Sequence, residues 1–171
     1  LEPAAGIGNF IGMVPEDIKA KFTGVEIDSI SGRIAKVLYP EADIKIQGFE
    51  TTKFNNYFDA AVSNVPFGDY KVFDSSYSKN YLIHDYYFLK TLDKLKAGGI
   101  IAFVTSKGTL DKKDSEIRKL ISEKARFLGA IRLPETAFKN ANTEVTTDII
   151  FLQKQDQNTR INDELKWLEI K

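Results

Sequence analysis

Short apolar runs alternate with helical patterns along this chain, and that alternation limits the possible fold more than any other feature. Residues 29–40 have helical spacing and end at a proline, and residues 80–99 have it and end on a pair of glycines. Residues 111–125 form a third amphipathic pattern, with Asp114 or Ser115 as its N-cap. Between these patterns lie runs that are apolar at nearly every position, as buried strands are: 22–27, 42–49, 58–63, 99–106, 127–134 and 147–154.

Strands that are apolar on both sides and alternate with helices form a mostly parallel sheet with helices on both faces. We therefore predict a doubly wound α/β fold. Residues 135–146 carry no helical pattern, so we expect the last strand to run antiparallel. The chain opens directly on a loop, from which we expect a truncated first strand and a fragment of a larger protein. We assign residues 1–154 to one domain, and residues 155–171 to a polar linker and the start of a further element.

Composition and charge exclude several classes of protein. The 171 residues are 43% hydrophobic and 28% charged, which is typical of a soluble globular domain. No apolar run approaches the roughly 20 residues of a membrane helix, and without Cys there is no disulfide, thiolate nucleophile or Cys-based zinc site. We expect a cytoplasmic protein with no metal and no membrane partner. With 24 basic and 24 acidic residues the net charge is zero, so any DNA would be bound mainly through regions missing from this chain.

The loop at the start of the chain, "EPAAGIGNFIG", has closely spaced glycines where a helix is expected to begin. Gly6 and Gly8 would let the backbone approach a ligand, and the free N–H groups of a helix would face it. The dinucleotide fingerprint requires a third glycine where Ile11 stands, so a NAD or FAD site is a poor match. A tight turn without a ligand is the alternative.

Acidic and aromatic residues follow the first two predicted strands. Glu26 comes about 20 residues after Gly6, where a parallel α/β fold places the carboxylate that binds ribose hydroxyls. Asp28 fits better as the N-cap of the following helix. Phe49 stands where an adenine ring would lie, or else belongs to the core, and Glu50 could accept a hydrogen bond from an adenine amino group. Together these residues indicate an adenosine-containing ligand.

The stretch "SNVPFGDY" ends the third predicted strand, at the same sheet edge as the other loops. The side-chain oxygen of Asn64 and a neighbouring backbone carbonyl can accept both hydrogens of an exocyclic NH2 group, which frees its lone pair for attack. Pro66 fixes the direction of that carbonyl. Phe67 offers a ring on which a planar base can stack. A proline turn with a core phenylalanine is the alternative.

These segments resemble a known enzyme family. "LEPAAGIGNF", "GVEID" and "SNVPFGDY" are similar to motifs I, II and IV of the amino-group DNA methyltransferases that make N6-methyladenine, and residues 84–111 and 143–154 are similar to later segments of that family. The resemblance extends to methylase domains inside large bacterial, plasmid or phage proteins with helicase-like regions. It implies a seven-stranded-type, Rossmann-like methyltransferase sheet, S-adenosylmethionine as cofactor, DNA as partner, and a role in restriction–modification or anti-restriction.

The resemblance also implies a role for each matching residue. Asn64, the carbonyl of Val65 or Pro66, and Phe67 would hold a target adenine flipped out of the duplex. Phe138 would pack on the other face of that base. The cofactor would be held, from its methionine part to its adenine, by Glu2, Pro3, Ala5, Gly6, Gly8, Glu26, Ile27 and Phe49, with Glu50 substituting for the acid missing at position 48.

The sequence thus predicts an adenine-specific DNA methyltransferase and leaves alternatives open. Asn-Val-Pro-Phe stands where the family usually has two prolines, and the segment that precedes the glycine loop in the family is missing. The same chemistry would serve methylation of a glutamine amide in a protein or of a base in RNA. A catalytically inactive scaffold that binds cofactor or DNA is a further alternative. Residues that fit packing rather than catalysis are His84, Tyr81, Tyr86, Tyr87 and Phe88.

Overall fold

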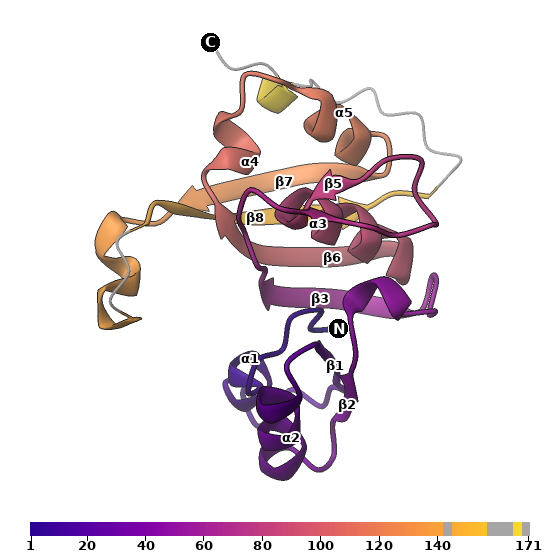
Figure 1. The fold of residues 1–171 in the computed structure, drawn as a ribbon, viewed down its shortest axis with the longest axis vertical. Coiled ribbons are helices and arrows are strands. Elements are labelled where there is room, and N and C mark those ends of the chain that lie inside the picture. The colour runs from indigo at the N-terminus through magenta and orange to yellow at the C-terminus, as the bar shows by residue number, and fades with distance from the viewer. Residues whose placement is uncertain (142–144, 157–165, 169–171) are drawn as a thin grey trace.

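The computed structural model describes residues 1–141, 145–156 and 166–168, and Figure 1 shows the arrangement of its helices and strands. The strands are β1 (Thr23–Glu26), β2 (Asp43–Ile46), β3 (Phe58–Asn64), β4 (Lys71–Val72), β5 (Tyr81–Leu82), β6 (Leu95–Ser106), β7 (Ala125–Arg132) and β8 (Thr147–Lys154). The α-helices are α1 (Asn9–Gly12), α2 (Ser29–Leu38), α3 (Ile83–Lys94), α4 (Gly108–Asp111) and α5 (Glu116–Ser122). Short 3-10 helices are η1 (Phe49–Thr51), η2 (Glu135–Ala141) and η3 (Lys166–Leu168).

Two sets of strands are joined edge to edge by the first two residues. β1 pairs parallel with β2, while β3, β6, β8 and β7 lie in that order, with β3 and β6 parallel and β8 antiparallel to both of its neighbours. The Glu2 N–H donates to the Thr23 carbonyl at 2.9 Å, and the Leu1 nitrogen donates to the Ala60 carbonyl at 2.8 Å. The predicted α/β sheet, mostly parallel with an antiparallel last strand, is confirmed.

Every predicted strand is present, and the differences concern element ends and short elements. Residues 80–99 are predicted as one helix, but α3 ends at Lys94 and β6 begins at Leu95. Leu95 is fully buried and pairs with Phe58, so its burial in the sheet outweighs the helical spacing of the segment. The sequence patterns do not predict β4 and β5, which are two residues each and too short to show a hydrophobic period, nor the 3-10 helix η2.

Two predicted helix caps have clear counterparts. The carboxylate of Asp28 accepts a hydrogen bond from the Ser31 N–H at 2.7 Å at the start of α2. At the start of α5 the carboxylate of Asp114 accepts from the Glu116 N–H at 2.9 Å, while Ser115 occupies the cap position without a side-chain bond. Each bond satisfies a backbone donor that the helix leaves free, so both helices begin at these residues.

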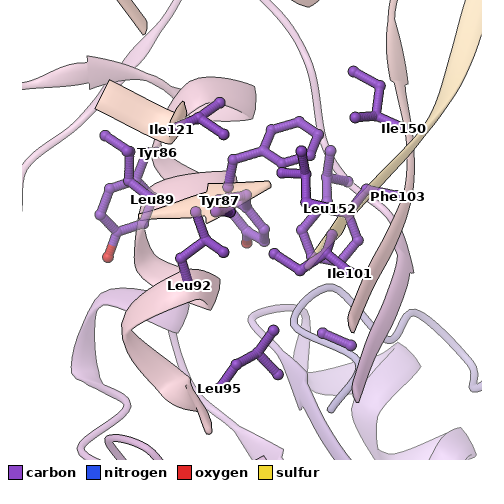
Figure 2. Close-up of a cluster of buried hydrophobic side chains, with 14 of the residues drawn as sticks. Tyr86, Tyr87, Leu89, Leu92, Leu95, Ile101, Phe103, Ile121, Ile150 and Leu152 are labelled. Carbon is purple, nitrogen blue, oxygen red and sulfur yellow. The ribbon is translucent and has the colours of Figure 1, made fainter. Parts of the chain in front are cut away.

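The main core lies between α3 and one face of the four-stranded set, and Figure 2 shows its side chains. The register places Ile101 beside Leu152 and Phe103 beside Ile150, and all four are buried. From α3, the ring of Phe88 packs on Phe103 with ring centroids 5.2 Å apart. Burial of such side chains is the main stabilising contribution to a fold of this size.

Helix α2 packs on the other face of the sheet, over β1 and β2. Gly32 and Ala35 are its buried residues, and a Cβ added at Gly32 would lie 2.8 Å from the side chain of Ile46. Ile46 pairs with Glu26, whereas Val25, the preceding residue of β1, belongs to the core on the α3 side. Helices therefore lie on both faces, as a doubly wound fold requires.

Candidate active site

A cavity of about 230 Å³ lies at the edge of the sheet where β1, β2 and β3 end. Ligands of open α/β sheets bind outside the carboxyl ends of the strands, because the loops that follow the strands meet there. Segments from the first loop, three strand ends and helix α3 contribute to its wall. The lining residues are Pro3, Ala4, Gly6, Val25, Glu26, Ile27, Gln47, Phe49, Asn64, Pro66 and Tyr87.

The structure brings about half of the predicted site residues to this cavity. Those that line it are Pro3, Gly6, Glu26, Ile27, Phe49, Asn64 and Pro66. Those that neighbour them in the chain without lining it are Glu2, Ala5, Gly8, Val65 and Phe67. Glu50 and Phe138 lie elsewhere.

Glu26 connects the end of β1 to the glycine loop. One carboxylate oxygen accepts from the Gly6 N–H at 2.7 Å, and the other accepts from the Asp28 N–H at 2.7 Å. These bonds fix the side chain at the cavity wall. Since each carboxylate oxygen has two lone pairs, both oxygens can accept a further bond from a ligand hydroxyl.

Glu2 is a buried acid beside this loop. Only 2% of it is exposed, and within the described residues its Oε2 atom has no hydrogen-bond partner. Burial raises the pKa of its carboxyl to about 8, partly opposed by the amino terminus and assisted by the charge of Glu26. A buried acceptor without a partner is costly, and a cationic ligand group would satisfy it.

The glycine loop depends on residues without side chains. Gly6 and Gly8 have φ angles of 53° and 89°, in the left-handed region that favours glycine. A Cβ at Gly8 would lie 2.6 Å from the ring of Tyr39, whereas a Cβ at Gly6 would meet nothing within 4 Å. The loop thus packs on the end of α2 at Gly8 and leaves open space at Gly6. Ala5 is buried and holds the loop to β1, since its N–H donates to the Val25 carbonyl at 2.9 Å.

Aromatic side chains line the same cavity as Glu26. Phe49 is 2% exposed and belongs to the core, and it also lines the cavity, where its contact with an adenine ring stays a prediction. Its centroid lies 5.1 Å from that of Tyr87, a residue that sequence reasoning assigned only to packing. Gln47, directly after β2, also lines the cavity but was not among the predicted site residues. Its position, as a polar residue at the carboxyl end of a strand, could have indicated it. Ile27 is 74% exposed at the rim.

The "SNVPFG" segment continues β3 out to the cavity. Asn64 is its last strand residue, pairs with Val104, and lines the cavity together with Pro66. Val65 is buried, and its N–H donates to the Val104 carbonyl at 3.0 Å, which fixes the turn that follows. Phe67 is 37% exposed, so its ring does reach solvent as the stacking interpretation requires.

Two predicted residues lie away from the cavity wall. The Glu50 carboxylate folds back over Gly48, where an added Cβ would lie 2.0 Å from its Oε1 atom, and Glu50 lines a different cavity. Phe138 lies in η2, at a point where the backbone leaves helical geometry. Figure 1 shows η2 beyond the end of the sheet towards which the β3 arrow points.

His84, which the sequence assigns to packing, does not line the cavity. His84 is 5% exposed, in the first turn of α3, and Lys112 donates to the neighbouring Asp85 carboxylate at 2.8 Å.

No helix among the described residues is both long and apolar enough to span a bilayer. In the same part of the chain, His, Asp and Glu side chains form no group of three or more that could hold a metal. Of the linker and further element assigned to residues 155–171, positions 157–165 and 169–171 lie outside the described residues.

Comparison with known proteins gives the family. The model of the N-6 DNA Methylase family matches residues 20–166. Over 161 residues the chain is 35% identical to "Defense against restriction protein B" of Escherichia phage P1, a match that covers 90% of this chain and 7% of that protein. The chain therefore spans a small part of the length of this curated relative.

Solved structures share the fold. A Listeria monocytogenes protein assigned as a class I S-adenosylmethionine-dependent methyltransferase superposes with a TM-score of 0.80 at 22% identity, over 95% of this chain and 55% of that one. A Vibrio vulnificus protein assigned as a modification subunit of a type I restriction enzyme gives 0.72 at 16% identity, over 90% and 39%. With the family model matching most of its length, the chain belongs to the N-6 DNA methylase family.

Proposed function

We propose that this chain transfers a methyl group from S-adenosylmethionine to the N6 amino group of an adenine in DNA. The observation that supports the proposal is the meeting of Asn64 and Pro66 with Glu26 and Phe49 around one cavity. The first pair belongs to the segment that would hold the target amine, and the second to segments that would hold the cofactor. Methyl transfer requires the two reactants in contact, and residues of both groups of segments line this one cavity.

The residues present fit the cofactor, which supplies an electrophilic methyl group when bound. The Glu26 carboxylate is held by two backbone N–H groups and keeps free lone pairs for ribose hydroxyls. The unpartnered oxygen of buried Glu2 suits an ammonium group. Phe49 and Ile27 offer apolar surfaces at the cavity for an adenine ring.

The acceptor amine would be activated by hydrogen bonds alone. The lone pair of an adenine amino group is delocalised into the ring, and two acceptors pull the nitrogen towards tetrahedral geometry. The side-chain oxygen of Asn64 and the backbone carbonyl before or at Pro66 would be those acceptors. The Val65–Val104 bond holds this turn in place. Held in this way, the amine nitrogen would be the nucleophile that takes the methyl group which the bound cofactor would supply, and the proton that it gives up would go to water.

An Asn64→Ala variant tests the proposal. Methyl incorporation into adenine-containing DNA, measured as N6-methyladenine by mass spectrometry, should fall at least about 100-fold, as expected when a preorganised polar group is removed from a transition state. Cofactor affinity should stay unchanged. Asn80→Ala, at an exposed Asn before β5, is the matched control. Equal rates in the Asn64 variant and the wild type would contradict the proposal.

Other acceptors are alternatives with the same chemistry. A glutamine amide in a protein or a base in RNA has a similarly delocalised amine, so the assay should offer DNA, RNA and protein in parallel. An inactive scaffold would bind the cofactor and methylate none of them. Because the curated relative is far longer than this chain, we expect most DNA contacts outside residues 1–171, and the assay should include any longer protein that contains them.

A further inference from the structure

A second cavity, of about 600 Å³, lies along α3 towards the opposite edge of the sheet. Its wall combines the connection from η1 to β3, the segment after β4, the last turn of α3 and the end of β8. Lys94 and Lys154 mark that edge, because one precedes the start of β6 and the other ends the antiparallel strand β8. The proposed methyl transfer uses none of these segments apart from η1.

One ion pair in the cavity wall is already complete. Lys90 donates to the Asp74 carboxylate at 2.5 Å, with both side chains 4% exposed. The same carboxylate accepts from the Tyr86 hydroxyl at 2.7 Å and from the Ser76 N–H at 2.9 Å. Although burial opposes ionisation, these bonds from Lys90, Tyr86 and Ser76 hold the pKa of Asp74 well below its usual range. Asp74 and Lys90 therefore neutralise each other and form part of the fixed wall.

Two further lysines have only neutral acceptors among the described residues. Lys94 is 5% exposed and donates to the Asn55 side-chain oxygen at 2.8 Å. Lys154 donates to the Asn56 side-chain oxygen at 2.6 Å and to the Leu95 carbonyl at 2.7 Å. Burial lowers the pKa of both lysines and Lys90 lowers that of Lys94 further, while the charge of Asp93 partly opposes the shift in both and that of Asp74 does so for Lys94. Lys94 is buried and Lys154 is partly buried, and neither has a carboxylate in hydrogen-bond contact among the described residues, so an anion in the cavity would stabilise both.

Among the described residues, no carboxylate of the wall is hydrogen-bonded to Lys94 or Lys154. Asp93 instead accepts from Lys124 at 2.5 Å and from the Tyr77 hydroxyl at 2.6 Å. The Glu50 carboxylate folds over Gly48. Asp74 is paired with Lys90, as described above. The charge left over in the cavity is positive.

A buried hydroxyl also lacks a partner there. Thr52 lines the cavity and is 5% exposed, and within the described residues its Oγ1 atom makes no hydrogen bond. Ser75 and Ser76 lie in the same wall, as do the amide groups of Asn55 and Asn56. Lysine, hydroxyl and amide donors are the groups that proteins use to bind phosphate oxygens.

We propose that this second cavity binds a phosphate group, carried by a nucleotide or by a nucleic-acid backbone, through Lys94, Lys154 and Thr52. Its volume lies within the range of roughly 300–1,000 Å³ that is common for small-ligand sites, so a mononucleotide fits. The site is separate from the proposed methyl-transfer cavity, and the two proposals can fail independently.

Calorimetric titration of the 171-residue chain tests this site, at constant ionic strength, with inorganic phosphate, adenosine monophosphate and a short oligonucleotide. We expect saturable binding, weakened about tenfold or more by Lys154→Gln and by Thr52→Val, since each removes a direct donor to a charged ligand. Lys96→Gln is the matched control, because Lys96 is an exposed lysine paired with Asp59 and its loss changes net charge equally.

The outcomes show which molecule carries the phosphate and which results would overturn the proposal. The probe that binds most tightly identifies the source. In lysine side-chain NMR, saturation should raise the pKa of Lys94, a shift that a purely structural lysine would not show. Absence of saturable binding by all three probes would overturn the proposal, as would equal weakening by Lys154→Gln and Lys96→Gln.

Discussion

The two cavities lie towards opposite ends of the same parallel strands and are built by different means. The smaller one, at the carboxyl edge, is made of loops that directly follow strands, with a glycine turn, an acid and aromatic rings in its wall. The larger one is made of long side chains that reach across the fold, such as Lys154 to Asn56 over 98 positions and Lys94 to Asn55 over 39. Motif spacing can describe the first kind of site, whereas only tertiary packing assembles the second.

Helix η1 is the element that the two cavities share. Phe49 lines the smaller cavity and the next residue, Glu50, lines the larger one. The Tyr86 ring lies 6.3 Å from that of Phe49, and its hydroxyl donates to Asp74 in the wall of the larger cavity. A change at one cavity could therefore reach the other through this helix, and variants at each site measure whether it does.

The largest effect is expected from Asp74→Ala. Removing this carboxylate leaves Lys90 buried without its partner, which should lower the free energy of unfolding by about 3–5 kcal/mol in urea denaturation. Asp59→Ala removes an exposed ion pair with Lys96 and should leave stability nearly unchanged. A similarly small effect of both variants would contradict the assigned role of Asp74. A loss of cofactor affinity in Asp74→Ala, with folding intact, would show coupling through η1.

Glu26→Ala should affect the smaller cavity alone. Loss of the carboxylate removes the ribose acceptor and releases the Gly6 N–H, so we expect affinity for S-adenosylmethionine to fall about 100-fold in calorimetric titration. Asp28→Ala is the matched control, since it removes a neighbouring carboxylate that only caps α2. Equal losses in the two variants would point to damage at the start of α2 instead of lost cofactor contacts. Phosphate binding at the larger cavity should remain in both.

Phe67→Ala should give a smaller effect, confined to the acceptor. If the 37% exposed ring stacks on the target base, its loss should raise the KM for DNA about tenfold and leave cofactor affinity unchanged. Phe73→Ala removes a more exposed ring, 75% accessible, from the next connection, between β4 and β5, and serves as the control. An unchanged KM in the Phe67 variant would favour the simple proline turn.

The sequence predicted elements and loops well where backbone conformation restricts the residue type. A glycine is required at position 8 by the positive φ and by the contact with Tyr39. Asn64 ends a strand with a clear apolar run, and Pro66 follows it. It failed where the position of a side chain depends on distant contacts. Tyr87 lines the smaller cavity because α3 turns it towards Phe49, and Glu50 leaves that cavity because its carboxylate folds over Gly48.

Glu2 offers the finest test of the smaller cavity, through pH. Burial raises the pKa of this carboxyl to about 8, so near pH 7 it is mostly protonated, and only its ionised form attracts the ammonium of the cofactor. Affinity should therefore rise several-fold between about pH 7 and 8.5 relative to Glu2→Gln, in which position 2 does not titrate. The variant also corrects for the titration of the cofactor's own amino group, since α-amino groups titrate near pH 8 in model peptides. The stability contribution has the opposite sign: it is complete below the unfolded pKa of 4.5 and is lost as the pH rises through about 8. Parallel pH profiles of affinity in the two proteins would mean that Glu2 does not face the cofactor.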